Sequence, residues 1–198
     1  MTSIGYIPNA VKRLKLVSAF KGYNLGVLDC IEISRNEQIM VVDDEECTHI
    51  STATEDAARC CFCINPNRKE IVVLPIDKKL IKQRQGGMAD GAAFDENKFA
   101  FLEFKDQAQG NTSEAVKGTY TKAASQLSAA LDLFSDKLKD EKVAIDFIKK
   151  VNVICHIIVS EKFPRSSALE QNMMLSFALS NNGVGLSFER EVRFNHTE

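Results

Sequence analysis

Acidic and basic side chains follow an apolar run in the middle of the chain. Residues 99–102 are Phe-Ala-Phe-Leu, and the tripeptide Glu103-Phe104-Lys105 comes directly after them. A run that is apolar at every position is typical of a central strand buried on both faces. Alternation along such a strand places Glu103 and Lys105 on one face, about 7 Å apart. Ionised groups are costly at a buried strand end unless they are paired or bind a ligand, so this pair is a candidate functional site.

A second carboxylate is expected opposite Glu103. The sequence predicts two strands, over residues 88–94 and 99–105, joined by the polar turn of residues 95–98. If the turn is centred between residues 96 and 97, Asp90 and Glu103 are equidistant from its centre and are cross-strand partners. Two carboxylates placed in this way repel each other unless a positive charge lies between them.

A divalent cation would relieve this repulsion. Mg²⁺ prefers one or two protein carboxylates and completes its coordination with waters and phosphate oxygens. A nearby lysine, here Lys105, could orient a water as nucleophile and offset the charge that develops at phosphorus. The tripeptide acid-x-Lys alone is not specific: it occurs four times in the chain, against about two by chance. The strand context and the paired Asp90 are what single out Glu103.

The helix that follows is the strongest in the sequence. Thr112 or Ser113 can cap it, and apolar residues then recur at steps of three and four. Tyr120 belongs to this apolar stripe and is expected in the core, whereas Gln126 lies off the stripe and could reach the site.

Three segments together resemble the PD-(D/E)XK nuclease superfamily, over roughly residues 70–160: GGMADGAAF, FAFLEFK and SEAVKGTYTKAASQLSAALDLF. The resemblance implies a restriction-endonuclease-like fold and an endonuclease that uses Mg²⁺ or Mn²⁺ to hydrolyse phosphodiester bonds, with DNA favoured over RNA. It implies that Asp90 and Glu103 bind the metal, that the Phe104 carbonyl adds a contact and that Lys105 is catalytic. We add Gln126 as a catalytic candidate.

The sequence departs from the superfamily pattern in two ways. Ala89 stands where the motif's name has proline. Many members also use an acidic residue from an earlier helix, for which Glu46 and Glu55 are the candidates.

Many enzymes of this fold act as dimers, so a homodimer is an open expectation. The alternative from another class is a catalytically inactive module that keeps the fold and binds a partner.

Basic residues near the predicted strand ends could bind phosphates. The net charge of −2 gives no global positive field, so a nucleic-acid site must be local. Residues 68–84 hold six basic side chains against two acidic ones, and further basic residues bracket the strand predicted at 151–159. Solvated strand ends explain these charges equally well. The candidates for phosphate binding are Lys79, Lys82, Arg84, Lys162 and Arg165.

The six cysteines are not preceded by a secretory signal, which favours thiols in a reducing cytoplasm over disulfides. Cys47, His49, Cys60, Cys61 and Cys63 could in principle form a zinc site, although the usual paired C-x-x-C is missing. The apolar stretch 151–160 has half the roughly 20 residues of a membrane helix, so no membrane association is expected.

The order of predicted elements gives an α/β fold with a mixed central sheet flanked by helices. We expect a single domain over residues 1–198, with a less regular N-terminal portion over 1–65 and a nuclease-like core over 66–198. The elements of that core are strands at 71–74, 88–94, 99–105, 151–159 and 184–194, and helices from 113 and over 167–179.

Overall fold

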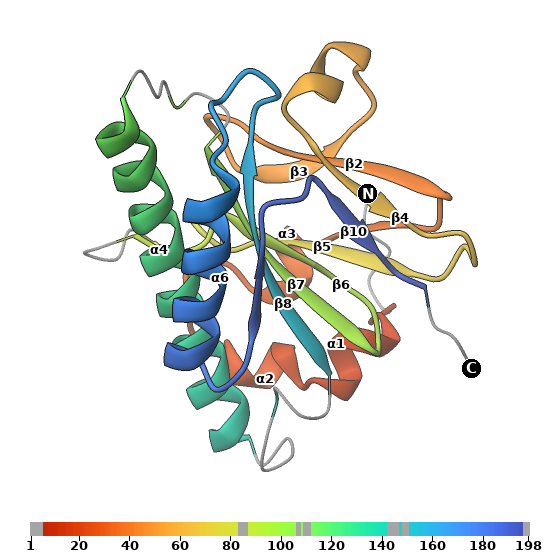
Figure 1. Cartoon of the computed structure of the whole chain (residues 1–198). Helices are drawn as coiled ribbons and strands as arrows, with labels where there is room; N and C mark the ends of the chain where they lie inside the picture. Colours follow the sequence, from red (N-terminus) through yellow and green to blue (C-terminus); the bar gives the residue numbers. More distant parts are fainter. Residues whose placement is uncertain are drawn as a thin grey trace.

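The structure is a computed structural model that describes residues 6–82, 87–105, 108, 112–141, 147 and 151–195 (Figure 1). Its helices are α1 (Asn9–Arg13), α2 (Leu16–Ala19), α3 (Val27–Cys30), the 3-10 helix η1 (Thr54–Ala58), α4 (Ser113–Asp140) and α6 (Ser167–Ser180). Its strands are β1 (Glu32–Ser34), β2 (Gln38–Asp43), β3 (Thr48–Ser51), β4 (Cys61–Ile64), β5 (Ile71–Pro75), β6 (Gly91–Phe94), β7 (Lys98–Lys105), β8 (Asn152–Val159), β9 (Gly185–Ser187) and β10 (Glu191–Arg193).

A mixed sheet lies at the centre of the molecule. Within the described residues it has six strands, in the order β1-β5-β6-β7-β8-β9. The β1, β5, β6 and β7 strands pair antiparallel, whereas β7, β8 and β9 pair parallel. The predicted α/β class with a mixed sheet is therefore confirmed. Because β7 and β8 run parallel, their carboxyl ends meet at the same edge of the sheet.

A second sheet, which the sequence did not predict, packs on one face of the central sheet, opposite the face that α4 and α6 cover. Its order is β10-β4-β2-β3, so the first 65 residues supply three of the four strands it has in the described part of the chain. The single strand expected over 184–194 is wrong. The Ser187 hydroxyl accepts a hydrogen bond from the Glu189 N–H (3.1 Å) and the chain turns there, so β9 ends in one sheet and β10 begins in the other.

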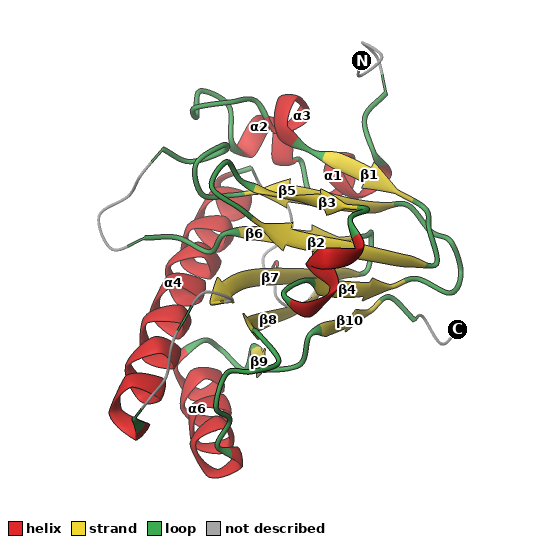
Figure 2. Ribbon diagram, turned by 90° about the horizontal axis from the view of Figure 1, so that it is seen from above, coloured by secondary structure: helices red, strands yellow, loops and turns green. Residues whose placement is uncertain are grey.

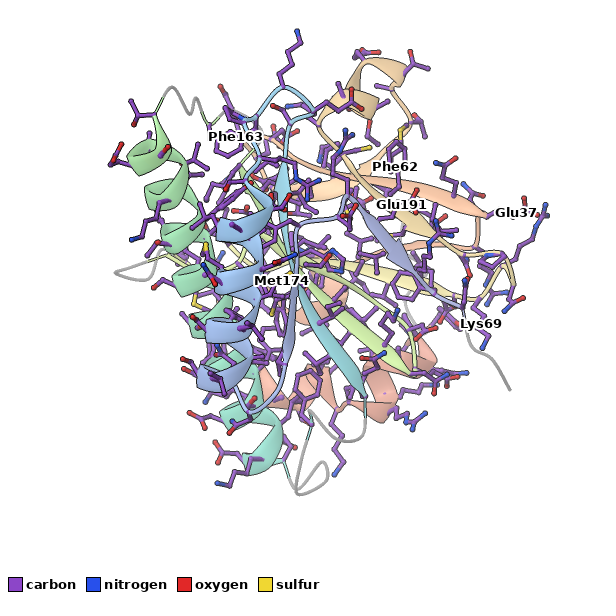
Figure 3. All side chains as sticks on the ribbon, in the orientation of Figure 1. Glu37, Phe62, Lys69, Phe163, Met174 and Glu191 are labelled. Atoms are coloured by element: carbon purple, nitrogen blue, oxygen red, sulfur yellow. The ribbon has the colours of Figure 1, made fainter. Side chains whose placement is uncertain are left out.

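Alternating side chains of the central sheet pack into two hydrophobic cores, one on each face of the sheet. Phe99 and Phe101 of β7 pack on the side of the helices, whereas Ala100 and Leu102 pack against the second sheet. Figure 2 shows α4 and α6 side by side along one side of the strands. Phe163, which Figure 3 labels near the upper ends of α4 and α6, belongs to the core on the side of the helices, and its ring lies 5.6 Å from that of Tyr120. The central strands are thus buried on both faces, as their apolar sequence predicts.

Helix α4 begins where the sequence predicts. The Thr112 side chain accepts a hydrogen bond from the Ala115 N–H (3.1 Å), which caps the helix. Tyr120 is fully buried, which confirms its place in the core. No helix in the described part of the chain combines the length and apolar character that crossing a membrane requires.

Candidate functional site

The β6–β7 hairpin has the register that the sequence predicts. Gly91 pairs with Leu102 and Phe94 with Phe99, so Asp90 lies opposite Glu103. The strand expected from residue 88 begins only at Gly91, because the ladder changes at Asp90. There the Phe104 N–H donates to Oδ2 of the Asp90 side chain at 2.6 Å rather than to the next backbone carbonyl. The Asp90 carboxylate is therefore held at the end of the central strands.

Glu103 has one oxygen without a partner. Its side chain is fully buried, and Oε1 accepts a hydrogen bond from Lys105 Nζ. Oε2 is the one buried side-chain nitrogen or oxygen atom among the described residues that has no hydrogen-bond partner. Leaving a buried charged oxygen unpaired is expensive, so this atom marks a position where a ligand would stabilise the protein.

Gln126 connects α4 to this cluster. Lys105 Nζ donates to Gln126 Oε1 at 3.2 Å, and Gln126 Nε2 donates to the Met88 carbonyl at 3.3 Å. Gly87, at φ +78°, leaves room for the amide, since a Cβ there would lie 2.7 Å from Gln126 Nε2. The structure thus brings together Asp90, Glu103, Lys105 and Gln126, the four side chains named from the sequence.

Burial and nearby negative charges make both carboxyl groups harder to ionise. Burial, followed by the charge of Asp43, raises the pKa of Asp90 to about 7. The pKa of Glu103 is raised well above its usual value, by burial first and by the charge of Asp90 second. The positive charge of Lys105 opposes both shifts. Keeping both carboxyl groups ionised would therefore need positive charge beyond that of Lys105.

Asp43, at the end of β2, is an acidic residue that the sequence reasoning missed. It lies close enough to raise the pKa of both Asp90 and Glu103. The two residues suggested instead, Glu46 and Glu55, are exposed, and the structure places Glu46 in the turn after β2 and Glu55 in η1. The signal available in the sequence is that Asp43 directly follows the apolar residues 39–42.

The basic residues suggested for phosphate binding that the structure describes lie around the sheet edge where β7 and β8 end. Lys79 and Lys82 follow β5, in the segment whose Ile76 and Asp77 N–H groups donate to the Asp90 carbonyl. Lys162 is exposed in the loop after β8. Arg165 in that loop makes a bidentate pair with Glu170, at 2.9 Å for each bond. Arg84 lies outside the described residues.

The cysteines do not form a recognisable metal site. All six are free thiols, and Cys60, Cys61 and Cys63 are buried. The imidazole of His49 faces the Asp44 carboxylate at 3.6 Å. Across the described ranges, no three His, Cys, Asp or Glu side chains are grouped closely enough to hold a metal ion by themselves. The zinc hypothesis therefore gains no support from the arrangement.

The fold and site together define an α/β protein with paired carboxylates and a lysine at the end of its central strands. Comparisons with family models, curated proteins and solved structures find no match for this chain.

Proposed function

We propose that this protein is a divalent-cation-dependent nuclease that hydrolyses phosphodiester bonds at the Asp90–Glu103–Lys105 cluster. The observation that carries the proposal is the buried Glu103 Oε2, which has no partner although it lies in a cluster of like charges. A cluster that served only stability would be expected to pair this oxygen.

The residues present fit a Mg²⁺ or Mn²⁺ ion. Glu103 Oε2 is free to bind one, and Asp90 can offer Oδ1 because Oδ2 already accepts the Phe104 N–H. Two carboxylates are the number that Mg²⁺ takes from proteins when water and phosphate oxygens supply the rest. When bound, the ion would supply Lewis-acid polarisation of the phosphate.

The chain's own side chains hold the reacting groups in place. Gln126 Oε1 and Glu103 Oε1 both accept from Lys105 Nζ, which fixes the ammonium at the strand end. From there Lys105 would donate to a phosphate oxygen, offset its developing charge and orient the attacking water. Hydrolysis consumes one water, breaks one P–O ester bond and yields a phosphate monoester and a hydroxyl.

Local charge favours a nucleic-acid substrate. Lys79, Lys82 and Lys162 lie on the segments that leave β5 and β8 near the site, and their ammonium groups would contact backbone phosphates on either side of the cleaved bond. The overall charge of −2 means that this attraction is confined to the site. We assign DNA as the preferred substrate on the superfamily resemblance.

The test incubates the purified protein with single- and double-stranded DNA and RNA, in Mn²⁺, Mg²⁺ or EDTA. The variants are Asp90→Asn and Lys105→Ala, with Asp132→Asn and Lys122→Ala as matched controls on exposed positions of α4. We expect cleavage that requires the cation, falls at least 100-fold in both site variants and persists in both controls.

The alternative, a catalytically inactive binding module, makes a different prediction. It would show no cleavage of any substrate, and calorimetry would detect no Mn²⁺ binding that Asp90→Asn removes. That pair of results would overturn the nuclease proposal. If Mn²⁺ binding depends on Asp90, the proposed cation site stands even if a particular substrate is not cut.

A further inference from the structure

A cavity lies between the first turns of α4 and α6. Its volume is about 520 Å³, within the range of roughly 300–1,000 Å³ that is typical of small-molecule pockets. The start of α4, the start of α6 and the loop that leads into α6 form its walls. Figure 1 shows that both helices begin at the end of the molecule toward which β8 runs. The cavity therefore lies beside the sheet edge where β7 and β8 end.

The cavity is separate from the carboxylate cluster. Gln126 is the residue of α4 that accepts a hydrogen bond from Lys105 Nζ. Lys117, which lines the cavity, lies nine positions before Gln126, about 14 Å along the helix axis. None of the four side chains of the carboxylate cluster lines the cavity. A ligand in the cavity would therefore leave the proposed cation site free.

A buried network holds Arg165 at the wall of the cavity. Its Nε and Nη2 donate to the two carboxylate oxygens of Glu170, at 2.9 Å each. Glu170 is buried, and its Oε1 also accepts from the hydroxyl of the fully buried Tyr120 at 3.0 Å. The Arg165 side chain is still 45% exposed, so the N–H groups that Glu170 does not use can reach a ligand. A guanidinium held in this way is preorganised for binding.

The charges that face the cavity are positive. Lys117 lines it together with Arg165, and its side chain is exposed, so its ammonium group is accessible to a ligand. Among the described residues that line the cavity, none is acidic. Glu189, outside the lining, lies 3.8 Å from Arg165 Nη2 and is 73% exposed, so water screens its charge. The cavity is therefore suited to an anion.

The remaining lining residues indicate which kind of anion fits. The hydroxyl groups of Ser113 and Ser166 can donate to several acceptor oxygens, and the Ser166 side chain makes no capping hydrogen bond of its own. Val116 and Leu169 form an apolar wall that suits a sugar or a base. A phosphate monoester carries about −1.5 to −2 charges at pH 7 and three acceptor oxygens. It therefore matches two cations better than a carboxylate or a phosphodiester, each of which carries one negative charge.

We propose that this cavity binds the phosphate monoester of a nucleotide. Arg165 and Lys117 contact the phosphate, and the apolar wall of Val116 and Leu169 contacts the nucleoside. The inference goes beyond the proposed function, because it requires neither Asp90 nor a divalent cation. The same phosphate group occurs in a free mononucleotide and at the phosphorylated end of a nucleic-acid strand, and the experiment separates these two sources.

Calorimetry in EDTA measures how the full chain binds deoxyadenosine 5′-monophosphate, deoxyadenosine 3′-monophosphate and deoxyadenosine. The variants are Lys117→Met and Ser113→Asp, with Lys139→Met and Ser176→Asp as matched controls on exposed positions of α4 and α6. An acidic residue is favourable in the first turn of a helix, so Ser113→Asp should fold and yet repel the phosphate. We expect a monophosphate to bind at least tenfold more tightly than deoxyadenosine. Lys117→Met should weaken that binding about fivefold, Ser113→Asp at least tenfold, and each control less than about twofold.

Short thymidine oligonucleotides identify the source of the phosphate. They carry a phosphate at the 5′ end, at the 3′ end or at neither end. Tighter binding of a phosphorylated oligonucleotide than of the monophosphate would support the site and assign it to the end of a strand. Tighter binding of the monophosphate would support the site and assign it to a free nucleotide.

Three outcomes would overturn the inference: equal binding of deoxyadenosine and its monophosphates, unchanged monophosphate affinity in both Lys117→Met and Ser113→Asp, or no binding to the unaltered protein. If Ser113→Asp fails to fold, Lys117→Met decides alone, because it alters an exposed side chain. Cation-dependent cleavage without monophosphate binding would leave the nuclease proposal intact and remove this inference. Monophosphate binding without cleavage would retain this inference alone.

Discussion

The Phe104 N–H donates to Asp90 Oδ2 at 2.6 Å, at the point where the backbone ladder between β6 and β7 stops. If the ladder between β6 and β7 continued in this register, the Phe104 N–H would face the backbone of residue 89. The side chain of Asp90 takes over that role, so its position is set by the sheet rather than by a free rotamer. A carboxylate held in this way is preorganised for a ligand, because little side-chain entropy remains to be lost on binding.

Holding this carboxylate in place has a cost that can be measured. Because the pKa of Asp90 is about 7 in the folded chain and 3.8 for an unperturbed aspartate, ionisation is harder in the folded protein. The folded protein therefore holds a proton on Asp90 that the unfolded chain releases. The stability that this proton contributes is present at low pH and is lost as the pH rises from about 4 to above 7. We predict that Asp90→Asn raises the free energy of unfolding at pH 8 by on the order of 3 kcal/mol without divalent cations.

Urea unfolding at pH 8 and pH 5, in EDTA, checks this prediction. The gain should shrink strongly at pH 5, where Asp90 is largely protonated in the folded protein. Asp132→Asn, an exposed position on α4, is the control and should change stability by less than about 0.5 kcal/mol. Equal or lower stability of Asp90→Asn at pH 8 would mean that the carboxylate is satisfied in the folded protein.

Lys105 and Glu103 should be strongly coupled. Glu103 is fully buried and Lys105 is 19% exposed. Removing the ammonium group therefore leaves a buried carboxyl group whose two oxygens both lack a hydrogen-bond partner. We predict that Lys105→Met lowers the free energy of unfolding by about 2 kcal/mol at pH 8. Glu103→Gln combined with Lys105→Met should recover most of that loss, since neither position then carries a buried charge. A double-mutant cycle in urea tests this, and additive effects would contradict it.

The sequence predicted the part of the site that depends on local geometry. A four-residue turn fixes the hairpin register, so the pairing of Asp90 with Glu103 follows from counting outward from residues 96 and 97. Gln126 was identified because it departs from the apolar stripe of α4. These relationships span few residues or obey a fixed period.

The part that could not be predicted depends on contacts between sheets. Asp43 reaches the site only because β3 packs on β6 through Thr48 and Gly91, and nothing in the spacing of those residues encodes that contact. The strands of the second sheet are three to six residues long, too short for a clear alternation. The pairing of β10 with β4 joins residues more than 120 positions apart.

His156 should make the fold sensitive to acid. It is buried in β8, and its Nδ1 lies 3.0 Å from the Glu189 carbonyl, where the neutral ring can donate. Burial lowers the pKa of His156 from 6.5 to about 4. The unfolded chain therefore binds a proton that the folded chain does not, and stability falls as the pH drops from about 6.5 to 4. The expected loss attributable to His156 is about 3 kcal/mol.

His156→Asn isolates this contribution, because the amide can still donate to the Glu189 carbonyl but does not titrate. Between pH 7 and pH 4.5 the variant should lose less stability than the unaltered chain in urea unfolding. His49→Asn is the control, since that imidazole is partly exposed beside Asp44. Parallel pH profiles for the unaltered chain and His156→Asn would show that the buried ring does not set the acid limit.

Two glycines should respond in opposite ways to the same added methyl group. Gly118 lies in α4, and a Cβ added there would have open space within 4 Å, so Gly118→Ala should stabilise the helix by about 1 kcal/mol. At Gly91 the added Cβ would lie 2.7 to 2.9 Å from three atoms of Thr48, which β3 holds in place. Gly91→Ala should therefore destabilise the protein by about 2 kcal/mol.

The Gly91 substitution also tests how the site is assembled. Relief of the clash must move either Thr48 or the backbone at Gly91, which directly follows Asp90. Gly91→Ala should therefore weaken Mn²⁺ binding in calorimetry at a temperature where the protein is still folded, whereas Gly118→Ala should not. Destabilisation of Gly91→Ala with unchanged Mn²⁺ affinity would mean that the contact between the sheets supports the fold without positioning the carboxylates.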